Sequence, residues 1–420
     1  MKPEQIEALR PRLDAFLGEF APFFATRNTR AHFRTYVEGQ LGPLERKSVE
    51  PIADAAGVSS RNLQEFLSLL TWDEDAVRDQ IQRRVAREHQ SGEQIGLIDE
   101  TSFAKKGTET ACIQRQYCGA TGKVDNCVVT VHLAFCSGEF HTLLDSTIYV
   151  PKETWAEKPK RRKKVGIPKE VVYKPLHEIA LDQIERAKMN GVRLDWIGAD
   201  ERYGEVPDFL ETLEGWGLRY VLEVPKGLTG WTSRPPCDGE GRLAHDATKA
   251  RSLDEIVAHG RALRTTNYRA YHVKDTMKGP DVWEVKEIAF FQHRRGRVSP
   301  PLRLIVARNV LEGTRKTFLT NAPAAVPLET LLRVAFSRWR IERCFEDSKG
   351  EIGFDHFEVR RFGSIRRHLT VGMVSHLFLA EEADRQRGKK SGGDRVSGQA
   401  RRGRGAERRE AASGHEAAAR

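Results

Sequence analysis

Three acidic residues occupy positions from which their carboxylates could act together on metal ions. Asp99 directly follows a short apolar run, residues 95–98, and Asp200 directly follows another, residues 194–199. Glu342 lies in a later stretch with helical spacing. Three carboxylates can hold two Mg2+ or Mn2+ ions roughly 4 Å apart, and such a pair activates a water or a 3′-hydroxyl for in-line phosphoryl transfer. We therefore predict that these acids are metal ligands and catalytic residues, with Mg2+ as cofactor and Mn2+ as its substitute.

Each of these acids also has a simpler explanation. An aspartate at the end of a strand often caps a helix or closes a turn. Glu100 and Glu201 are neighbours that could take the two aspartate roles. On the helix the alternative is Glu346, one turn beyond Glu342. The spacing alone leaves these alternatives open.

Cations flank Glu342 at helical spacing. Arg338 lies four residues before it and Lys349 seven residues after it, so at about 100° per residue the three share one helical face. A neighbouring apolar stripe predicts the buried face of one helix over residues 328–351. Alone, the pattern also fits an exposed helix with a surface Arg–Glu pair. Because two aspartates are expected at strand ends nearby, we favour the interpretation that these cations hold a phosphate backbone. Arg340 is a further candidate for such a contact.

Strand and helix signals alternate over residues 91–225. If the run at residues 112–119 is only an edge ribbon, three strands are followed by helix, strand, helix and strand. That order implies a mixed sheet, antiparallel at first and then parallel through crossover helices. A Gly- and Pro-rich stretch with further strand-like runs predicts a β-rich insertion at residues 226–317, and helices return at residues 318–384. We therefore predict an α/β fold.

Residues 1–90 have the pattern of a helical domain that contains a helix-turn-helix. A helix of small residues meets Gly57, and a serine after it can cap a second helix that carries Arg61 and Asn62 outward. These side chains are suited to contacts with bases or phosphates. An ordinary helical hairpin would give the same pattern.

Two further segments are strongly basic. Residues 158–164 form a predicted loop that would contact phosphates as an arm, although charge runs are usually solvated or disordered. Its candidate DNA contacts are Lys160, Arg161, Arg162 and Lys163. Residues 385–420 lack aromatic side chains and are rich in Gly and Arg, which predicts a disordered basic tail.

The composition favours a folded protein with a polyanionic partner. Of the 420 residues 39% are hydrophobic, and the formal net charge is +10. Because the cations are clustered, we expect double-stranded DNA as the partner. The six cysteines form no Cys-x-x-Cys pair, which argues against a zinc site or a secreted disulfide scaffold. A polar start and the lack of a long apolar run predict no signal peptide and no membrane span, hence a cytoplasmic, nucleoid-associated protein.

Four motifs, in this order along the chain, resemble the DDE transposases of bacterial insertion sequences, in particular the insertion-sequence-four group. They are Asp99-Glu100-Thr101, Gln116-Tyr117-Cys118-Gly119, Gly198-Ala199-Asp200-Glu201-Arg202-Tyr203-Gly204 and Arg338-Trp339-Arg340-Ile341-Glu342. The group carries a Tyr-x2-Arg-x3-Glu-x6-Lys signature. Arg338, Glu342 and Lys349 match it, whereas Ala335 stands at the tyrosine position. The resemblance covers about residues 90–380.

The resemblance implies a ribonuclease H-like catalytic core in which Asp99, Asp200 and Glu342 bind the metal ions. It also implies that Arg338 and Lys349 hold the DNA backbone near the cleaved end. An insertion-domain tryptophan would stack on a flipped base, and the candidates for that role are Trp283 and Trp231.

The reaction implied is binding of the terminal inverted repeats, cleavage that frees 3′-hydroxyls, and joining of those ends to target DNA. Because both ends must be paired, we expect a homodimer on DNA. The tail after Ala380 differs from the helical C-terminus of the family and suggests a truncated or frame-shifted end. A non-catalytic DNA-binding protein and a structure-specific nuclease with the same core remain alternatives, although intact acids on all three elements favour catalysis.

Overall fold

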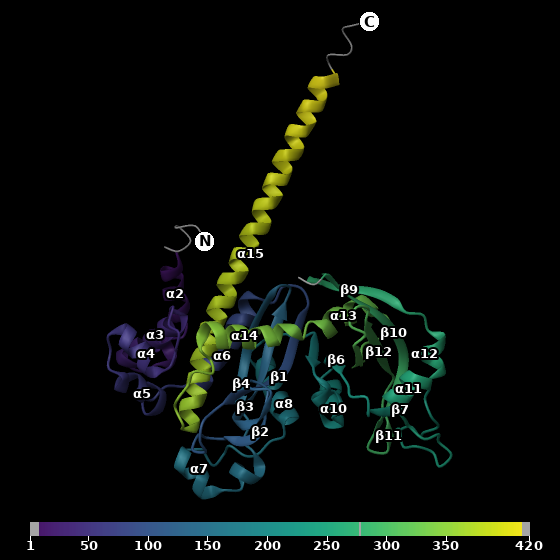
Figure 1. The fold of residues 1–420 in the computed structure, drawn as a ribbon, viewed down its shortest axis with the longest axis horizontal. Coiled ribbons are helices and arrows are strands. Elements are labelled where there is room, and N and C mark those ends of the chain that lie inside the picture. Colours follow the sequence, from purple (N-terminus) through teal and green to yellow (C-terminus); the bar gives the residue numbers. More distant parts are fainter. Residues whose placement is uncertain (1–7, 277–278, 414–420) are drawn as a thin grey trace.

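The computed structural model describes residues 8–276 and 279–413 of the chain, and side chains up to Arg387 outside residues 274–279. Helices of the N-terminal part and strands of the β-rich part lie on opposite sides of a central group of strands (Figure 1). The mixed α/β fold expected from the sequence is confirmed.

The N-terminal part is helical and packs around aromatic side chains. Phe24 stacks on Phe33 with ring centroids 4.4 Å apart, and Phe66 stacks on Trp72 at 5.2 Å. Gly57 ends α4 with a φ of 65°, a conformation that glycine adopts without a steric penalty, and α5 then begins. The helices are α2 (Leu9–Gly18), the 3-10 turn η1 (Ala21–Phe23), α3 (Arg27–Leu41), α4 (Val49–Ala56), α5 (Ser60–Ser68) and α6 (Glu74–Glu88).

A single mixed sheet runs from the centre of the molecule into the β-rich part. Its strands, in spatial order, are β2 (Gln114–Cys118), β3 (Lys123–Ser137), β1 (Gln94–Ala104), β5 (Trp196–Ala199), β6 (Arg219–Glu223), β13 (Arg315–Thr320), β12 (Leu302–Asn309), β10 (Gly279–Arg294), β7 (Thr229–Trp231) and β8 (Arg251–Ser252). Off this path, β4 (Phe140–Ile148) pairs with β3, while β9 (Arg269–Thr276) and β11 (Arg297–Val298) pair with β10.

The centre of the sheet is parallel and its flanks are antiparallel. β1 pairs antiparallel with β3 over its whole length, whereas β5 pairs parallel with β1 and with β6. This is the change from antiparallel to parallel pairing that the strand–helix alternation predicted. β13 pairs antiparallel with β6, so the β-rich insertion extends the central sheet. The insertion also contains α11 (Leu253–His259) and α12 (Arg261–Thr265).

Helices cover both faces of the central strands. α8 (Leu176–Met189) lies on one face, where Gln183 hydrogen-bonds the Val131 carbonyl and the Thr147 hydroxyl. The next residue of β3, His132, points to the other face, where its ring meets Phe345 of α14 (Trp339–Ile352) at 5.1 Å. α14 crosses β1, β3 and β4 on that face (Figure 1). The helix α10 (Pro207–Gly215) connects β5 to β6.

The single helix predicted over residues 328–351 is two helices. α13 (Leu328–Phe336) ends at Ser337, whose hydroxyl donates to the Val334 carbonyl at 2.7 Å. The N–H of Arg340 then bonds the Ser337 carbonyl at 2.9 Å, three residues back, so the chain tightens there before α14 begins. This break places Arg338 at the N-terminal end of α14 and not in a helix interior.

The last helix, α15 (Phe362–Ser413), packs against the N-terminal helices. Arg12 of α2 donates two hydrogen bonds to the Glu382 carboxylate, at 2.8 and 2.7 Å. Tyr36 of α3 hydrogen-bonds His368 at 2.9 Å in the buried contact between α3 and α15. α15 therefore closes the core of the N-terminal helices.

Two segments differ from the expected loop and tail. In place of a disordered tail from residue 385, α15 continues to Ser413 and extends away from the other elements (Figure 1). The segment holds many Arg, Lys, Glu and Ala residues, which favour helix, and no proline follows Pro327. The basic run at residues 158–164 forms most of α7 (Pro159–Val165), directly after a π-helical turn, η2 (Lys152–Ala156). Within the described residues, no helix is long and apolar enough to cross a membrane.

Candidate active site at the open end of the parallel strands

Asp99 lies within β1 and not at its end, because β3 keeps β1 extended as far as Ala104. Its direct partner on β3 is His132. The parallel pairing of β1 with β5 stops at Leu97 and Gly198, however, so the β5 side of β1 opens just before Asp99. The expected strand end therefore exists on one side of β1 only.

Asp200 directly follows β5, as predicted, and caps the short helix α9 (Glu201–Gly204). Its Oδ1 accepts a hydrogen bond from the N–H of Arg202 at 3.0 Å. The capping role that was the simpler explanation is thus present, and it fixes the carboxylate at the end of the strand beside β1.

Arg338 connects two of the three acids. Its Nη1 lies 3.1 Å from Asp99 Oδ2, and its Nη2 lies 3.0 Å from Glu342 Oε1. Glu342 stands in the first turn of α14 with its side chain 53% exposed, whereas the Asp99 side chain is 15% exposed. A residue of β1 and a residue of α14 that are far apart in sequence therefore meet around one guanidinium.

Burial raises the pKa of Asp99 to about 7. The neighbouring carboxylates of Glu100 and Asp200 raise it further, while the Arg338 cation opposes the change. Asp200 directly follows β5, which pairs with β1, so the two aspartates lie toward the same end of neighbouring strands. This end of the sheet is thus a place where negative charge is costly unless a cation neutralises it.

Glu223 is an acid at this site that the sequence interpretation missed. It is the last residue of β6, next to Leu222, which pairs with Ala199 immediately before Asp200. Burial lowers the pKa of Arg338, but the carboxylates around it, which include Glu223, raise it. The apolar pattern of the sequence predicts a strand here but does not mark its last residue, so Glu223 did not stand out as a strand-end acid.

Glu223 has two fixed neighbours. Its Oε2 lies 3.0 Å from Lys316 Nζ on β13. A Cβ at Gly204 would stand 2.1 Å from the Glu223 carbonyl oxygen, so the close approach of α9 to β6 requires a glycine at this position.

The alternative acids have other contacts. Glu100 accepts a hydrogen bond from the Tyr203 hydroxyl at 2.9 Å and forms an ion pair with Arg202. Burial raises the pKa of Glu100, and the Arg202 cation opposes this effect. Glu346 forms an ion pair with Arg343 at 3.4 Å and is exposed, as is Glu201. Of the predicted acids and their alternatives, Asp99 and Glu342 form ion pairs with Arg338, and Asp200 keeps its place directly after β5.

The donor chemistry of the site fits hard divalent ions. Carboxylate oxygens are the ligands that Mg2+ and Mn2+ prefer, and the buried Asp99 requires a positive partner. In the described part of the chain no three His, Cys, Asp or Glu side chains converge closely enough to hold a metal. The reason at this site is that Arg338 stands between Asp99 and Glu342. The donor set therefore has the chemistry for such ions, while Arg338 occupies an oxygen of two of the carboxylates.

Two predicted DNA contacts on α14 are used within the protein. Lys349 Nζ donates to Thr101 Oγ1 at 2.8 Å, which fastens α14 to β1, and burial lowers the pKa of this lysine. Arg340 bonds the Gly138 carbonyl and lies 3.1 Å from Glu139, so it holds the turn between β3 and β4. Contact of either side chain with DNA stays a prediction.

A small cavity of about 190 Å³ adjoins Arg338 and Glu342 on the side of the β-rich insertion. Lys316 and Trp283 also line it. Trp283 is 6% exposed, its ring lies 5.0 Å from Phe336, and its indole N–H donates to Asp281. These contacts anchor the ring, and its stacking on a base stays a prediction. The other candidate, Trp231, is 7% exposed and lies in another part of the insertion, on β7.

The remaining predicted contacts lie away from the acids. Arg61 and Asn62 are exposed at the start of α5, where Arg61 pairs with Glu65. On α7, Lys160 and Lys163 are exposed. Arg161 and Arg162 donate instead to carbonyls of the surrounding backbone, and the Arg161 guanidinium lies 3.8 Å from the centre of the Trp155 ring.

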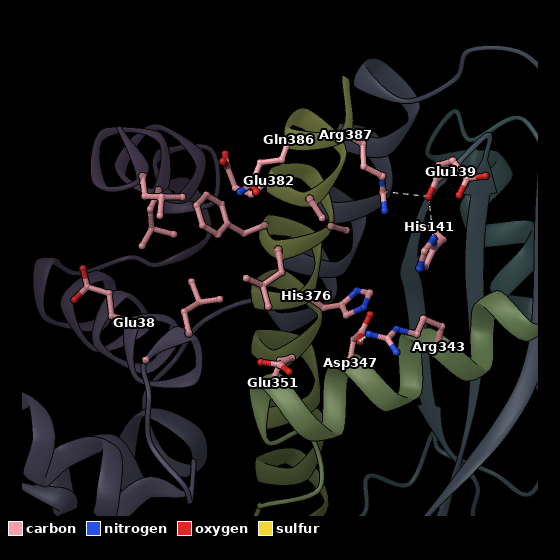
Figure 2. Close-up of a pocket in the computed structure, with 18 of the residues that line it drawn as sticks. Glu38, Glu139, His141, Arg343, Asp347, Glu351, His376, Glu382, Gln386 and Arg387 are labelled. Atoms are coloured by element: carbon pink, nitrogen blue, oxygen red, sulfur yellow. Dashed lines mark hydrogen bonds and ion pairs between the residues drawn. The ribbon is translucent and has the colours of Figure 1, made fainter. Parts of the chain in front are cut away.

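A larger cavity, of about 1190 Å³, is distinct from the acidic site. It lies between α2, α3, α14 and α15, and its wall includes Glu38 of α3 and His376 of α15 (Figure 2). Arg343 and Asp347, an ion pair at 2.8 Å, face it from α14. α14 therefore presents Glu342 to the strand ends and a different set of charges to this cavity.

The sequence of the chain is similar to those of known proteins. Residues 19–280, more than half of the chain, match the family described as DDE superfamily endonuclease. The chain belongs to this family. The matched residues of this DDE endonuclease contain Asp99 and Asp200, and Glu342 lies beyond them. The chain is also 30% identical over 216 residues to the probable transposase for insertion sequence element IS701 of Microchaete diplosiphon. The aligned region covers 50% of this chain and 53% of that protein. The DDE chain thus spans about half the length of this relative.

Proposed function

We propose that the chain is a transposase that cuts DNA at the ends of its own element and joins the freed 3′ ends to target DNA. The observation that carries the proposal is the meeting of Asp99 and Glu342 around Arg338 in a DDE endonuclease, with Asp200 directly after the neighbouring strand β5. The similarity to a probable insertion-sequence transposase supports this choice over a nuclease with another substrate.

In this proposal the central strands and α14 form a ribonuclease H-like core. The strand order β3-β1-β5-β6, with one antiparallel and two parallel pairings, supports it. Asp99 and Asp200 come from neighbouring strands, and Glu342 approaches from the helix across them.

Asp99, Asp200 and Glu342 would hold two Mg2+ ions, or Mn2+ in their place. When bound, such ions activate a water or a 3′-hydroxyl and stabilise the leaving oxygen of an in-line displacement. The protein groups do the positioning. The cap on α9 fixes Asp200, the Lys349–Thr101 bond fixes α14 on β1, and Arg338 offers a guanidinium to a DNA phosphate.

Double-stranded DNA is the proposed partner, with a homodimer that pairs the two element ends. The exposed Arg61 and Asn62 of the helix-turn-helix and the exposed lysines of α7 are suited to bind it. The net charge of +10 favours such a partner.

The test is cleavage of duplex DNA that carries an end of the element, with Mg2+ present. Asp99→Ala, Asp200→Ala and Glu342→Ala should each lower the rate by more than about 100-fold, since loss of even an outer partner of a metal ligand costs 10- to 100-fold. Glu346→Ala is the matched control, because this acid lies one turn farther along α14 and pairs with Arg343. Cleavage at the wild-type rate by any of the three variants would refute the assignment of that acid.

A further inference from the structure

We propose that Arg338 is a latch that holds the acids closed against metal ions until a DNA phosphate draws it away. The proposal rests on the proposed function and deepens it, because it makes loading of the metal depend on binding of DNA. The latch would keep a DNA-cutting site inactive in the absence of its substrate.

The first support is that the guanidinium occupies the ligand atoms themselves. Arg338 Nη1 contacts Asp99 Oδ2 at 3.1 Å, and Nη2 contacts Glu342 Oε1 at 3.0 Å. The planar fork of arginine joins two carboxylates in a fixed geometry, which a lysine ammonium cannot reproduce. Each of these oxygens would have to turn from the guanidinium to a divalent ion, so the two cations compete for the same atoms.

The second support is the position of Arg338 in the chain. It stands at the break between α13 and α14, and its side chain is 23% exposed. The backbone on both sides is fixed by Ser337 and by the first turn of α14, so release requires a change of side-chain rotamer and not of the fold. The latch can therefore open without moving Glu342.

The third support is a place to which the guanidinium can turn. The cavity of about 190 Å³ beside it is lined by Arg338, Glu342 and Lys316. A DNA phosphate at this cavity would meet two cations, and a bidentate contact with Arg338 would replace the two carboxylates that it gives up. Lys316 stays close to Glu223 at 3.0 Å, which keeps the second cation in place.

The thermodynamic consequence is reciprocal. If a DNA phosphate removes Arg338 from Asp99 and Glu342, DNA raises the affinity for divalent ions, and the ions raise the affinity for DNA by the same factor. If Arg338 merely supports α14 as an i,i+4 partner of Glu342, its loss lowers stability and leaves this coupling unchanged.

The experiment measures Mn2+ affinity of the full chain by calorimetry, without DNA and with duplex DNA from the element end, after subtraction of Mn2+ binding to DNA alone. Wild type should bind Mn2+ about tenfold more tightly with DNA, within the usual range of such couplings. Arg338→Gln should bind Mn2+ about as tightly without DNA as wild type does with it, and it should lose most of the DNA dependence.

Two further variants separate the latch from simple effects of charge and folding. Arg338→Lys keeps the charge but cannot bridge both acids, so it should also bind Mn2+ more tightly than wild type without DNA. Arg202→Gln is the matched control. It removes a cation that is paired with the neighbouring Glu100 but does not link Asp99 to Glu342. It should keep the DNA dependence of wild type.

Equal gains in Mn2+ affinity for Arg338→Gln and Arg202→Gln would overturn the latch and leave the proposed function intact. A wild-type DNA dependence in Arg338→Lys would do the same. Absence of Mn2+ binding in wild type with DNA would instead overturn the proposed function, and the latch with it. Thermal unfolding of each variant verifies that it is folded.

Discussion

Replacement of Asp99 by asparagine should abolish metal-dependent cleavage and yet make the metal-free protein more stable above neutral pH. The carboxylate is largely buried, at 15% exposure, and its pKa is raised from 3.8 to about 7. Burial is the main cause, Glu100 and Asp200 add to it, and the attraction of Arg338 does not fully offset them. Asparagine has nearly the same shape and carries no charge at any pH.

The sign and size of the effect follow from this shift. Because the folded pKa exceeds the unfolded one, the stability contributed by the protonated Asp99 is fully present below about pH 4 and is lost as pH rises through about 7. At about 1.4 kcal/mol per unit, the complete loss amounts to about 4 kcal/mol, of which about 3 kcal/mol falls between pH 4.5 and pH 8. Asp99→Asn avoids this loss.

The assay is urea unfolding of both proteins at pH 4.5 and pH 8 in the presence of a chelator. The stability difference, variant minus wild type, should rise by about 3 kcal/mol between the two pH values. Asp54→Asn on α4, where the side chain is exposed, should show no such change. Added Mg2+ should then stabilise wild type and not Asp99→Asn, since only a ligand that binds the folded state stabilises it. A difference that does not vary with pH would refute the argument and show that Arg338 fully compensates the buried charge.

Two further predictions concern other groups. Burial lowers the pKa of His376 to about 3, so the stability that its neutral form contributes is present above about pH 6.5 and is lost as pH falls toward 3. When pH falls from 7.5 to 5, the free energy of unfolding of His376→Gln should therefore decrease by about 2 kcal/mol less than that of wild type, as measured with urea. Replacement of the exposed His245 should leave the pH dependence of wild type in place. Lys160→Ala with Lys163→Ala should weaken DNA binding and lower the slope of log affinity against log salt by about 2, one for each phosphate contact. An unchanged slope would remove α7 from the DNA interface.

The elements that carry the acids were predictable because their signals are local. A short apolar run before Asp99 and another before Asp200 marked the strands, and the helical spacing around Glu342 marked α14. The parallel centre of the sheet followed from alternation of strands and helices. Gly57 marked the turn between α4 and α5 by the same kind of local signal.

The contacts of the site depend on pairings that local patterns do not show. The length of β1 beyond Asp99 is set by its register with β3, in particular by the pairing with His132. The break at Ser337 looks helical in sequence, because its residues have no helix-breaking side chain. The place of Glu223 beside Asp200 follows only from the pairing of β5 with β6. For the same reason, the attachment of Lys349 to β1 could not be read from its match to a signature.

The ion pairs between α2 and α15 have a consequence for synthesis of the protein on the ribosome. Arg12 of α2 is hydrogen-bonded to Glu382, and Tyr36 of α3 is hydrogen-bonded to His368, both in α15. The first helices therefore lack part of their packing until α15 has been translated. A fragment of residues 1–90 would expose the surface that α15 covers. The N-terminal helices, although translated before α15, should thus reach their final packing only after α15 has been made.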